Sequence, residues 1–289
     1  MKNLGLLLVA LFASVARLSA QVTVEVAMEQ EQFLPGETLP AAARIVNRSG
    51  QTLHLGADEG WLTFSVESPD GFVVFKKGEV PVRGEFTLES SERATKRVDL
   101  APYFNLLKPG RYAVRATIRI KEWEDRQVSS PPKGFDIIQG AKIWAQEFGV
   151  PRAAGTTNGA PEVRTYALQQ ANYLSKQLML YVQITDTKGQ INKVFPIGPM
   201  LSFGQPEPQL DKVSNLHILY QKGPHSFGYT VITPDGEVIV RQTYDYTSRP
   251  RLKPDADGHL AVVGGTRRVT SDDLPRPQAV ENNVKMPTP

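Results

Sequence analysis

The chain has 289 residues, with 33 Lys and Arg, 30 Asp and Glu, and no cysteine. The lack of cysteine excludes thiol catalysis, disulfides and thiolate metal sites, so the fold must be held together by burial of apolar side chains. The formal net charge of +3, with the two signs interspersed, argues against nucleic acid or an anionic membrane as the partner, because both require a concentrated basic surface.

The first twenty residues have the pattern of a secretory signal peptide. Lys2 precedes an apolar run over residues 4–15, and small residues lead to a cleavage point after Ala20, with Ala16 as the alternative. Cleavage after Ala20 removes Lys2 and Arg17, so the 33 basic residues become 31 against 30 acidic ones, a net charge of about +1. No later run reaches the roughly 18 to 20 apolar residues of a membrane span. We therefore expect a soluble protein without an integral membrane span, periplasmic or secreted.

The sequence from residue 21 to residue 139 predicts an antiparallel β-sandwich. Short runs alternate between apolar and polar residues, the pattern of half-buried strands. Turn signals separate them, such as the Ser-Pro-Asp-Gly of residues 68–71, where proline fixes φ and glycine accepts a positive φ. Seven or eight short strands at this spacing are typical of a sandwich. The expected strands cover residues 22–26, 39–46, 62–67, 72–75, 93–100, 111–120 and 133–138.

Two segments of this region resemble immunoglobulin-like and fibronectin-like domains. Residues 107–116, Leu-Lys-Pro-Gly-Arg-Tyr-Ala-Val-Arg-Ala, look like the entry to the penultimate strand of such domains, where a tyrosine hydroxyl ties the corner. Tyr112 is the matching position. Residues 35–37, leading to 45–47, look like the early strands of bacterial immunoglobulin-like modules. The resemblance implies a disulfide-free immunoglobulin-like sandwich over residues 21–139 and implies no particular function.

The second half, residues 140–268, predicts another antiparallel β domain. Residues 150–161 are expected to form a loop, and three apolar strands follow at residues 178–183, 216–221 and 259–263. Matching hairpins at residues 184–191 and 232–239 make the region resemble two propeller blades and a fragment. Too few blades are present to close a ring. In order of preference, the expected arrangements are a second sandwich, an open array, and a ring completed by other chains. Residues 269–289 are expected to be a disordered tail.

No catalytic, cofactor or metal motif stands up to physical scrutiny. Ser130 and Lys133 have the S-x-x-K spacing of serine acyl enzymes, but the two intervening prolines forbid the helix that this chemistry requires. Residues 223–228 have G-x-x-S-x-G spacing and predict a hairpin loop. Residues 255–258, Asp-Ala-Asp-Gly, lack the other ligands of a calcium loop. The four histidines do not occur at metal-ligand spacing. His217 and His259 lie on predicted strands and are expected to be part-buried, hydrogen-bonded residues. We therefore predict no catalytic residues, metal or cofactor.

The best candidate for binding is the segment at residues 237–251, which begins with an expected strand. It ends in Tyr244 and Tyr246, followed by Arg249 and Arg251, and tyrosine and arginine are frequent at recognition hot spots. The alternative is that both tyrosines complete a core or a cross-strand ladder. Alternation places one set of residues on a common face: Val238, Val240, Gln242, Tyr244 and Tyr246.

The function expected from these features is non-enzymatic binding or a structural role, with a protein or polysaccharide as partner. A first alternative is a carbohydrate-active enzyme or subunit that uses paired carboxylates in one cleft. A second is a protease-inhibitor-like role for an exposed rigid loop at residues 78–84. Trp61, Trp123 and Trp144 could form a sugar platform, although isolated tryptophans more often anchor a core.

Overall fold

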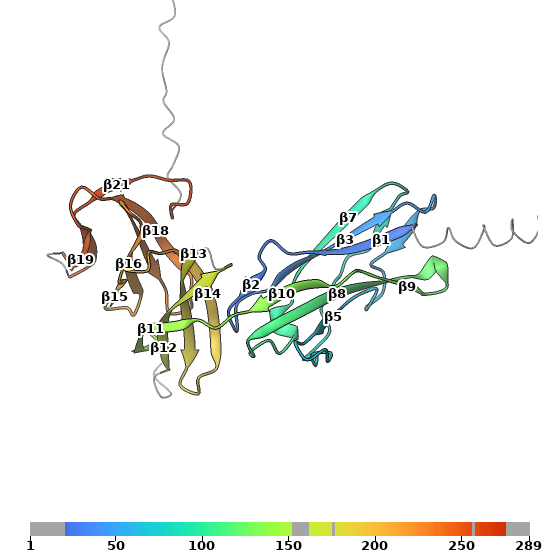
Figure 1. Cartoon of the computed structure of the whole chain (residues 1–289), viewed down its shortest axis with the longest axis horizontal. Helices are drawn as coiled ribbons and strands as arrows, with labels where there is room; N and C mark the ends of the chain where they lie inside the picture. Colours follow the sequence, from blue (N-terminus) through green and yellow to red (C-terminus); the bar gives the residue numbers. More distant parts are fainter. Residues whose placement is uncertain (1–20, 152–161, 175–176, 256–257, 276–289) are drawn as a thin grey trace, which may run out of the picture. The chain divides into compact units, whose positions relative to one another are not determined.

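The computed structural model describes residues 21–151, 162–174, 177–255 and 258–275, and within them the protein is all-β (Figure 1). The chain divides into two compact units, one ending at Gln139 and the other beginning at Gly140. Among the described residues, no helix has the length and apolar character needed to cross a membrane. The predicted signal peptide and most of the predicted loop at residues 150–161 lie outside the described residues.

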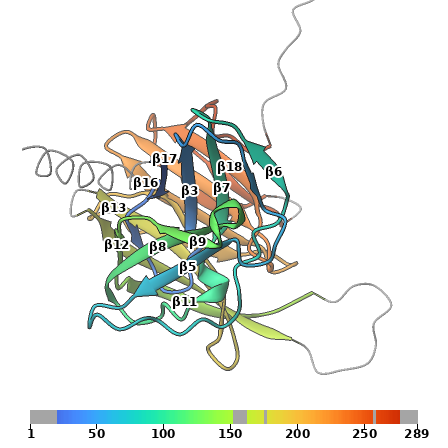
Figure 2. The ribbon, with the colours of Figure 1, turned by 90° about the vertical axis from the view of Figure 1, so that its right-hand side faces the viewer.

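The first unit contains two larger sheets and a short ladder (Figures 1 and 2). One sheet has the order β1 (Val22–Ala27), β3 (Pro40–Asn47), β7 (Arg93–Asp99). The other has the order β2 (Gln32–Phe33), β10 (Lys133–Ile137), β8 (Gly110–Ile120), β5 (Leu62–Glu67), with β9 (Arg126–Ser129) paired to β8. Its pairs are antiparallel except that β2 runs parallel to β10. The short ladder joins β4 (Leu53–Leu55) to β6 (Phe86–Leu88).

Alternating side chains from both sheets form one core. In β8, every second residue from Tyr112 to Ile120 is buried, and Ala43 and Ile45 of β3 belong to the same apolar cluster. The ring of Tyr112 stacks on Phe135, with centroids 5.7 Å apart. Its hydroxyl donates a hydrogen bond to the carbonyl oxygen of Lys108 at 2.7 Å, which confirms the predicted corner contact.

The strand predicted at residues 72–75 is wrong, although the turn before it is correct. The amide of Gly71 donates to Ser68 O at 2.9 Å, closing the turn. After it only Val74 packs against the core, whereas Phe72 and Phe75 are 74% and 83% exposed. The run is apolar throughout and does not alternate, so its composition defines no buried face. The segment makes a single isolated bridge, from Val73 to Glu67, instead of a ladder.

The second unit is built of two antiparallel meanders, in which consecutive strands are neighbours. The first has the order β11 (Ala141–Gly149), β12 (Val163–Tyr173), β13 (Gln177–Asp186), β14 (Ile191–Pro199). The second has the order β15 (Glu207–Leu210), β16 (Leu216–Gly223), β17 (Ser226–Ile232), β18 (Val238–Asp245), β21 (Thr266–Arg268). Tyr166 and Val182 of the first sheet share an apolar cluster with Ile218 and Ile232 of the second. The two sheets therefore pack face to face, the preferred arrangement predicted from the sequence.

The second sheet is buried on its other face as well. The hairpin of β19 (Arg251–Pro254) and β20 (Leu260–Val263) contributes Leu252 and Val262 to a cluster with Leu219 and Tyr229. Burial on both faces explains why every residue of β17 from Phe227 to Ile232 is buried, without alternation.

The predicted repeat is only partly reflected in the topology. The matching hairpins occupy equivalent places, because each joins the third and fourth strands of its meander. The anchor runs do not: residues 178–183 lie in the third strand of the first sheet, and residues 216–221 lie in the second strand of the other. The third run, residues 259–263, belongs to the two-stranded hairpin. Apolar content alone therefore did not identify equivalent strands.

The ordered chain continues past Arg268 into the predicted tail. The backbones of Leu274 and Arg241 exchange hydrogen bonds of 2.9 and 3.1 Å. Asp273 is 2% exposed and pairs with Arg267 at 2.5 Å. Residues 276–289 lie outside the described part of the chain.

A buried polar network stabilises one end of the second sheet. His217, which is 8% exposed, lies with Nδ1 2.7 Å from the Tyr229 hydroxyl and Nε2 3.3 Å from Asp211 Oδ2. This confirms the hydrogen-bonded role predicted for His217. The burial predicted for His259 is wrong, because its side chain is 81% exposed. Burial alone would raise the pKa of Asp211, but hydrogen bonds from Asn215, His217 and Val213 outweigh it and hold the pKa below its usual value.

We expect Asp211→Asn to destabilise the second unit by about 1–3 kcal/mol at neutral pH, because a part-buried carboxylate that accepts several hydrogen bonds is lost. Since the folded-state pKa of Asp211 is lowered, its contribution is present above the unfolded-state value and is lost as pH falls through the folded-state value. Urea unfolding at pH 7 and pH 3 should show the variant's deficit shrinking at low pH. The exposed Asp272→Asn is the matched control, and an equal deficit at both pH values would contradict this account.

Candidate functional site

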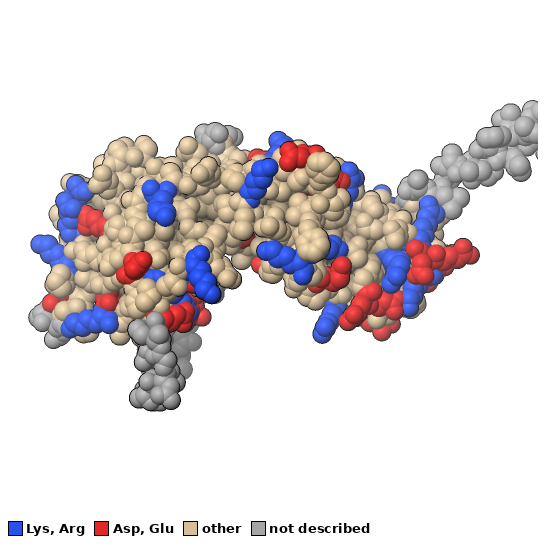
Figure 3. Space-filling model, turned by 90° about the horizontal axis from the view of Figure 1, so that it is seen from below, with Lys and Arg blue, Asp and Glu red and all other residues tan. Residues whose placement is uncertain are grey.

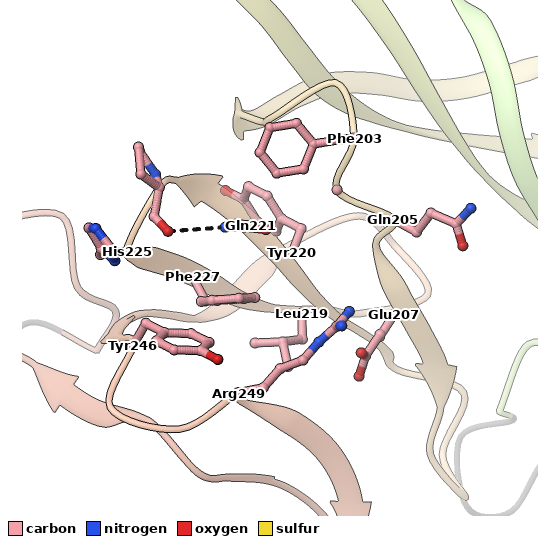
Figure 4. Close-up of a pocket in the computed structure, with 12 residues that line it drawn as sticks. Phe203, Gln205, Glu207, Leu219, Tyr220, Gln221, His225, Phe227, Tyr246 and Arg249 are labelled. Atoms are coloured by element: carbon pink, nitrogen blue, oxygen red, sulfur yellow. Dashed lines mark hydrogen bonds between the residues drawn. The ribbon is translucent and has the colours of Figure 1, made fainter.

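A groove of about 400 Å³ lies on the second unit, where the connection between β14 and β15 meets β16, β17 and the chain after β18 (Figure 4). Its walls combine aromatic rings with amide, imidazole, carboxylate and guanidinium groups, the mixture typical of ligand sites. The lining residues are Phe203, Gly204, Gln205, Glu207, Leu219, Tyr220, Gln221, Pro224, His225, Phe227, Tyr246 and Arg249.

Phe203 stands at one side of the groove on a turn that backbone hydrogen bonds hold in place. The Leu201 amide donates to Gln221 O at 3.1 Å, and the Gly204 amide donates to Leu201 O at 3.0 Å. Although the backbone is fixed, the Phe203 side chain is 77% exposed. A large apolar ring held in solvent on an ordered turn, beside a hollow, is a feature of interaction sites.

A second exposed ring stands opposite. Tyr246, which is 50% exposed, stacks on Phe227 with centroids 6.3 Å apart and an interplanar angle of 24°. The backbone amide of Tyr246 donates to His225 O at 2.8 Å, which fixes the ring just past the end of β18. Figure 4 shows the Phe227 and Tyr246 rings side by side and Phe203 across the groove. The groove thus presents two accessible aromatic faces.

Tyr220 also lines the groove, and its ring belongs to the core between the two sheets. Its ring lies against Gly228 on the neighbouring strand, where an added Cβ would come within 2.8 Å of ring atoms, so only glycine leaves room. Burial raises the pKa of Tyr220 to about 12. Its hydroxyl therefore stays protonated and donates to Ile197 O at 3.5 Å, as a structural group.

Polar side chains mark the two ends. Glu207 and Arg249 lie at one end and His225 at the other (Figure 4). The Glu207 carboxylate is already paired with Arg251 at 2.5 Å, and Gln221 Nε2 donates to Pro224 O at 3.2 Å. Glu207 is the single carboxylate among the residues lining this groove. The arrangement offers hydrogen bonds and ring faces, without the pair of carboxylates that glycoside hydrolysis uses.

The structure separates the four predicted binding residues. Tyr246 and Arg249 line the groove, and Arg251 borders it through its pair with Glu207. Tyr244 does not line it: its ring packs against the outer cluster beneath Arg267, 5.7 Å from the centroid, and its hydroxyl donates to Gln242 at 2.9 Å. Tyr244 thus packs against the outer cluster as a part-buried residue.

The common face predicted for residues 238–246 is broken by a β-bulge. Ile232 pairs with Val238 and Val231 with Val240, so Ile239 is an extra residue in β18. Val238 consequently packs against the core between the sheets, and Val240 packs against the outer cluster. Strict period-two counting could not reveal this change of face.

The other motifs considered in the sequence lie in turns, hairpins or hydrogen-bonded positions of the fold. Ser130 is 2% exposed and accepts the Ala116 amide at 3.0 Å, while Lys133 pairs with Glu31 at 2.7 Å, so the two do not face one another as a catalytic pair. Residues 223–228 lie at the β16–β17 hairpin, as predicted. Asp255 accepts the His259 amide at 2.8 Å and closes a turn, of which residues 256–257 lie outside the description.

The tryptophans do not form one platform. Trp61 is 3% exposed and donates to Val82 O at 3.0 Å, which ties the loop at residues 78–84 to the core. Trp123 packs at the edge of the same core and donates to Gln51 at 3.1 Å. Trp144 belongs to the second unit, where it is part-buried against the core between the sheets.

Charges are mixed on the face shown in Figure 3, where Lys and Arg alternate with Asp and Glu and much of the surface is uncharged. This face therefore presents no field of one sign.

Comparison with known proteins adds little. No protein-family model matches the chain, and no curated protein does. Among solved structures the chain is similar to Spo0M, a sporulation control protein from Bacillus subtilis, at 11% identity and a TM-score of 0.30, over 70% of this chain and 79% of that one. A likeness of this size carries no argument about fold family or function.

Proposed function

We propose that this chain is an exported, non-enzymatic binding protein and that the groove between Phe203 and Tyr246 binds a polysaccharide. The single observation that carries the proposal is the pair of exposed rings, 77% and 50% accessible, held on ordered backbone across a hollow lined by amides. The C–H bonds on a sugar face are attracted to the electron-rich face of an aromatic ring. The hydroxyls at the sugar rim can exchange hydrogen bonds with Gln205, Gln221 and Arg249.

The proposal includes the finer architecture. The first unit is an immunoglobulin-like module, supported by the order β1-β3-β7 against β2-β10-β8-β5 and by the Tyr112 corner bond. The second unit consists of two blade-like meanders that pack face to face. In this arrangement the first unit is a spacer or attachment module and the second carries the ligand.

The binding test is native electrophoresis through gels that contain soluble polysaccharides, one linkage type per gel. The protein is expected to be retarded by at least one glycan. Tyr246→Ala and Phe203→Ala should each weaken binding by about tenfold or more, as loss of a hot-spot ring does. The matched control is Phe72→Ala with Phe75→Ala, which removes exposed rings from the first unit. Absence of retardation in every gel, or equal loss in the control, would contradict the proposal.

Export is tested separately, by the N-terminus of the protein recovered from bacterial cells. We expect the mature chain to begin at Gln21 and to be recovered from the periplasm or medium, because the apolar run ends before the small residues at positions 19 and 20. Mass spectrometry of the intact protein reads this directly. A chain retained in the cytoplasm with Met1 in place would refute the export prediction. The binding proposal for the groove would be unaffected.

A further inference from the structure

A second groove of about 500 Å³ lies beside the first on the same unit. The two grooves share Gly204 and Gln205 in their linings. The second is lined by part-buried and exposed apolar side chains from β11, chiefly Trp144 and the 38% exposed Ile143, with Gln170 of β12 nearby. Adjacent residues of a regular strand point to opposite faces, and the β-bulge between Lys142 and Trp144 explains how Ile143 and Trp144 line the same hollow.

The turn that separates the grooves is anchored to both sheets. The Met200 amide donates to Leu178 O of the first sheet at 2.9 Å, and the Leu201 amide donates to Gln221 O of the second at 3.1 Å. Phe203 stands on this turn and lines the first groove, whereas Ser202 lines the second. Both hollows therefore border one connection, which is bonded to both sheets.

We propose that both grooves are occupied together by one extended β-1,4-linked glycan strand, with Trp144 as a ring contact at the second position. This inference rests on the proposed function of the first groove and extends it to a ligand class. A β-1,4 linkage gives a flat, extended ribbon that presents ring faces at regular intervals, so it can reach separate aromatic side chains. An α-1,4-linked chain curves instead and serves as the contrasting ligand.

The polar groups of the second groove agree with a ligand that carries no strong charge there. The residues lining the second groove include Gln170, Ser202 and Gln205 and no Asp, Glu, Lys or Arg. Amide and hydroxyl groups both donate and accept, which suits the hydroxyl and acetamido groups of a neutral sugar. Gln205 lines both grooves and is placed to contact the sugar at the junction.

Chain length is the measurable consequence. A ligand that reaches the second groove binds there at a high effective concentration, so it gains affinity over one that fills only the first. Calorimetric titration of the processed protein should show cellohexaose or chitohexaose binding at least about tenfold more tightly than the corresponding disaccharide. Maltohexaose, the α-linked hexamer, should show no such gain.

The variant Trp144→Leu keeps apolar bulk against the core and removes the flat ring. It should lower hexasaccharide affinity by about fivefold or more and leave disaccharide affinity unchanged, with Trp123→Leu in the first unit as the matched control. Gln170→Ala, which removes an amide that lines only the second groove, should also weaken the hexasaccharide and leave the disaccharide unchanged, which keeps the test valid if Trp144→Leu folds poorly. If the disaccharide and the hexasaccharide bind with equal affinity, and neither variant changes it, the inference about the second groove is overturned. The proposal that the first groove binds a sugar would then still stand. No binding of any β-linked sugar would overturn both.

Discussion

Replacing Tyr166 by alanine should lower the free energy of unfolding of the second unit by about 3–5 kcal/mol, the usual cost of removing a large buried aromatic side chain. Tyr166 is fully buried in β12, and its ring stacks on Phe148 with centroids 4.0 Å apart and 15° between the planes. Its hydroxyl lies 3.2 Å from Ser214 O and 3.4 Å from Ile232 O, and so links the first sheet to the second. Burial raises the pKa of Tyr166 well above its usual value, so the hydroxyl remains a donor at all ordinary pH values.

The measurement is urea unfolding followed by tryptophan fluorescence, in which Trp144 reports on the second unit. Tyr166→Phe keeps the ring and loses the hydroxyl, and should cost about 1–2 kcal/mol. A larger loss for alanine than for phenylalanine is required by the account. If Tyr166→Ala and Tyr166→Phe have equal free energies of unfolding, the Tyr166 ring does not contribute to the packing of the two sheets.

Replacing Trp61 by alanine should destabilise the first unit by a similar amount, about 3–5 kcal/mol. Trp61 is 3% exposed, meets Phe86 edge-on with centroids 5.6 Å apart, and donates its indole hydrogen to Val82 O at 3.0 Å. The last contact ties the loop at residues 78–84 to the core. The variant should therefore also release this loop, and trypsin should cleave faster after the exposed Arg83.

Trp61→Phe is the control, because it retains most of the apolar contact and loses the indole donor. It should lie between the wild type and alanine in stability and should also speed cleavage at Arg83. Unchanged cleavage in both variants would show that the loop is held by Val80, which is 7% exposed, and not by the indole bond.

The strands that could be predicted from the sequence are those with one buried face. Alternation identified β1, β5, β7 and β8, and turn chemistry placed the hairpins at residues 184–191 and 232–239. The strands β11 and β12 were not predicted, because their apolar residues follow no clean period. In β11 a bulge shifts the register, and in β12 three consecutive residues, Tyr166 to Leu168, are buried.

Part of the lining of the candidate groove was predictable from the sequence. Tyr246 and Arg249, which line it, were predicted because tyrosine and arginine cluster after one strand. Phe203, Gln205 and Gln221 were not predicted as groove residues. Phe203 and Gln205 lie on the connection between the two sheets and Gln221 lies near the end of β16, so they come together only in the folded chain. A signal was present: Phe203 is an aromatic residue between the turn formers of Leu-Ser-Phe-Gly-Gln-Pro, where a buried residue is not expected.

The central claim, that the groove between Phe203 and Tyr246 is the ligand site, is tested most directly by amide hydrogen exchange. The exchange rates are compared with and without a saturating β-1,4-linked hexasaccharide, cellohexaose or chitohexaose. We predict slower exchange at residues 201–206 and 244–249, and unchanged exchange throughout the first unit. Protection confined to the first unit, or no protection at residues 201–206 and 244–249, would contradict the account.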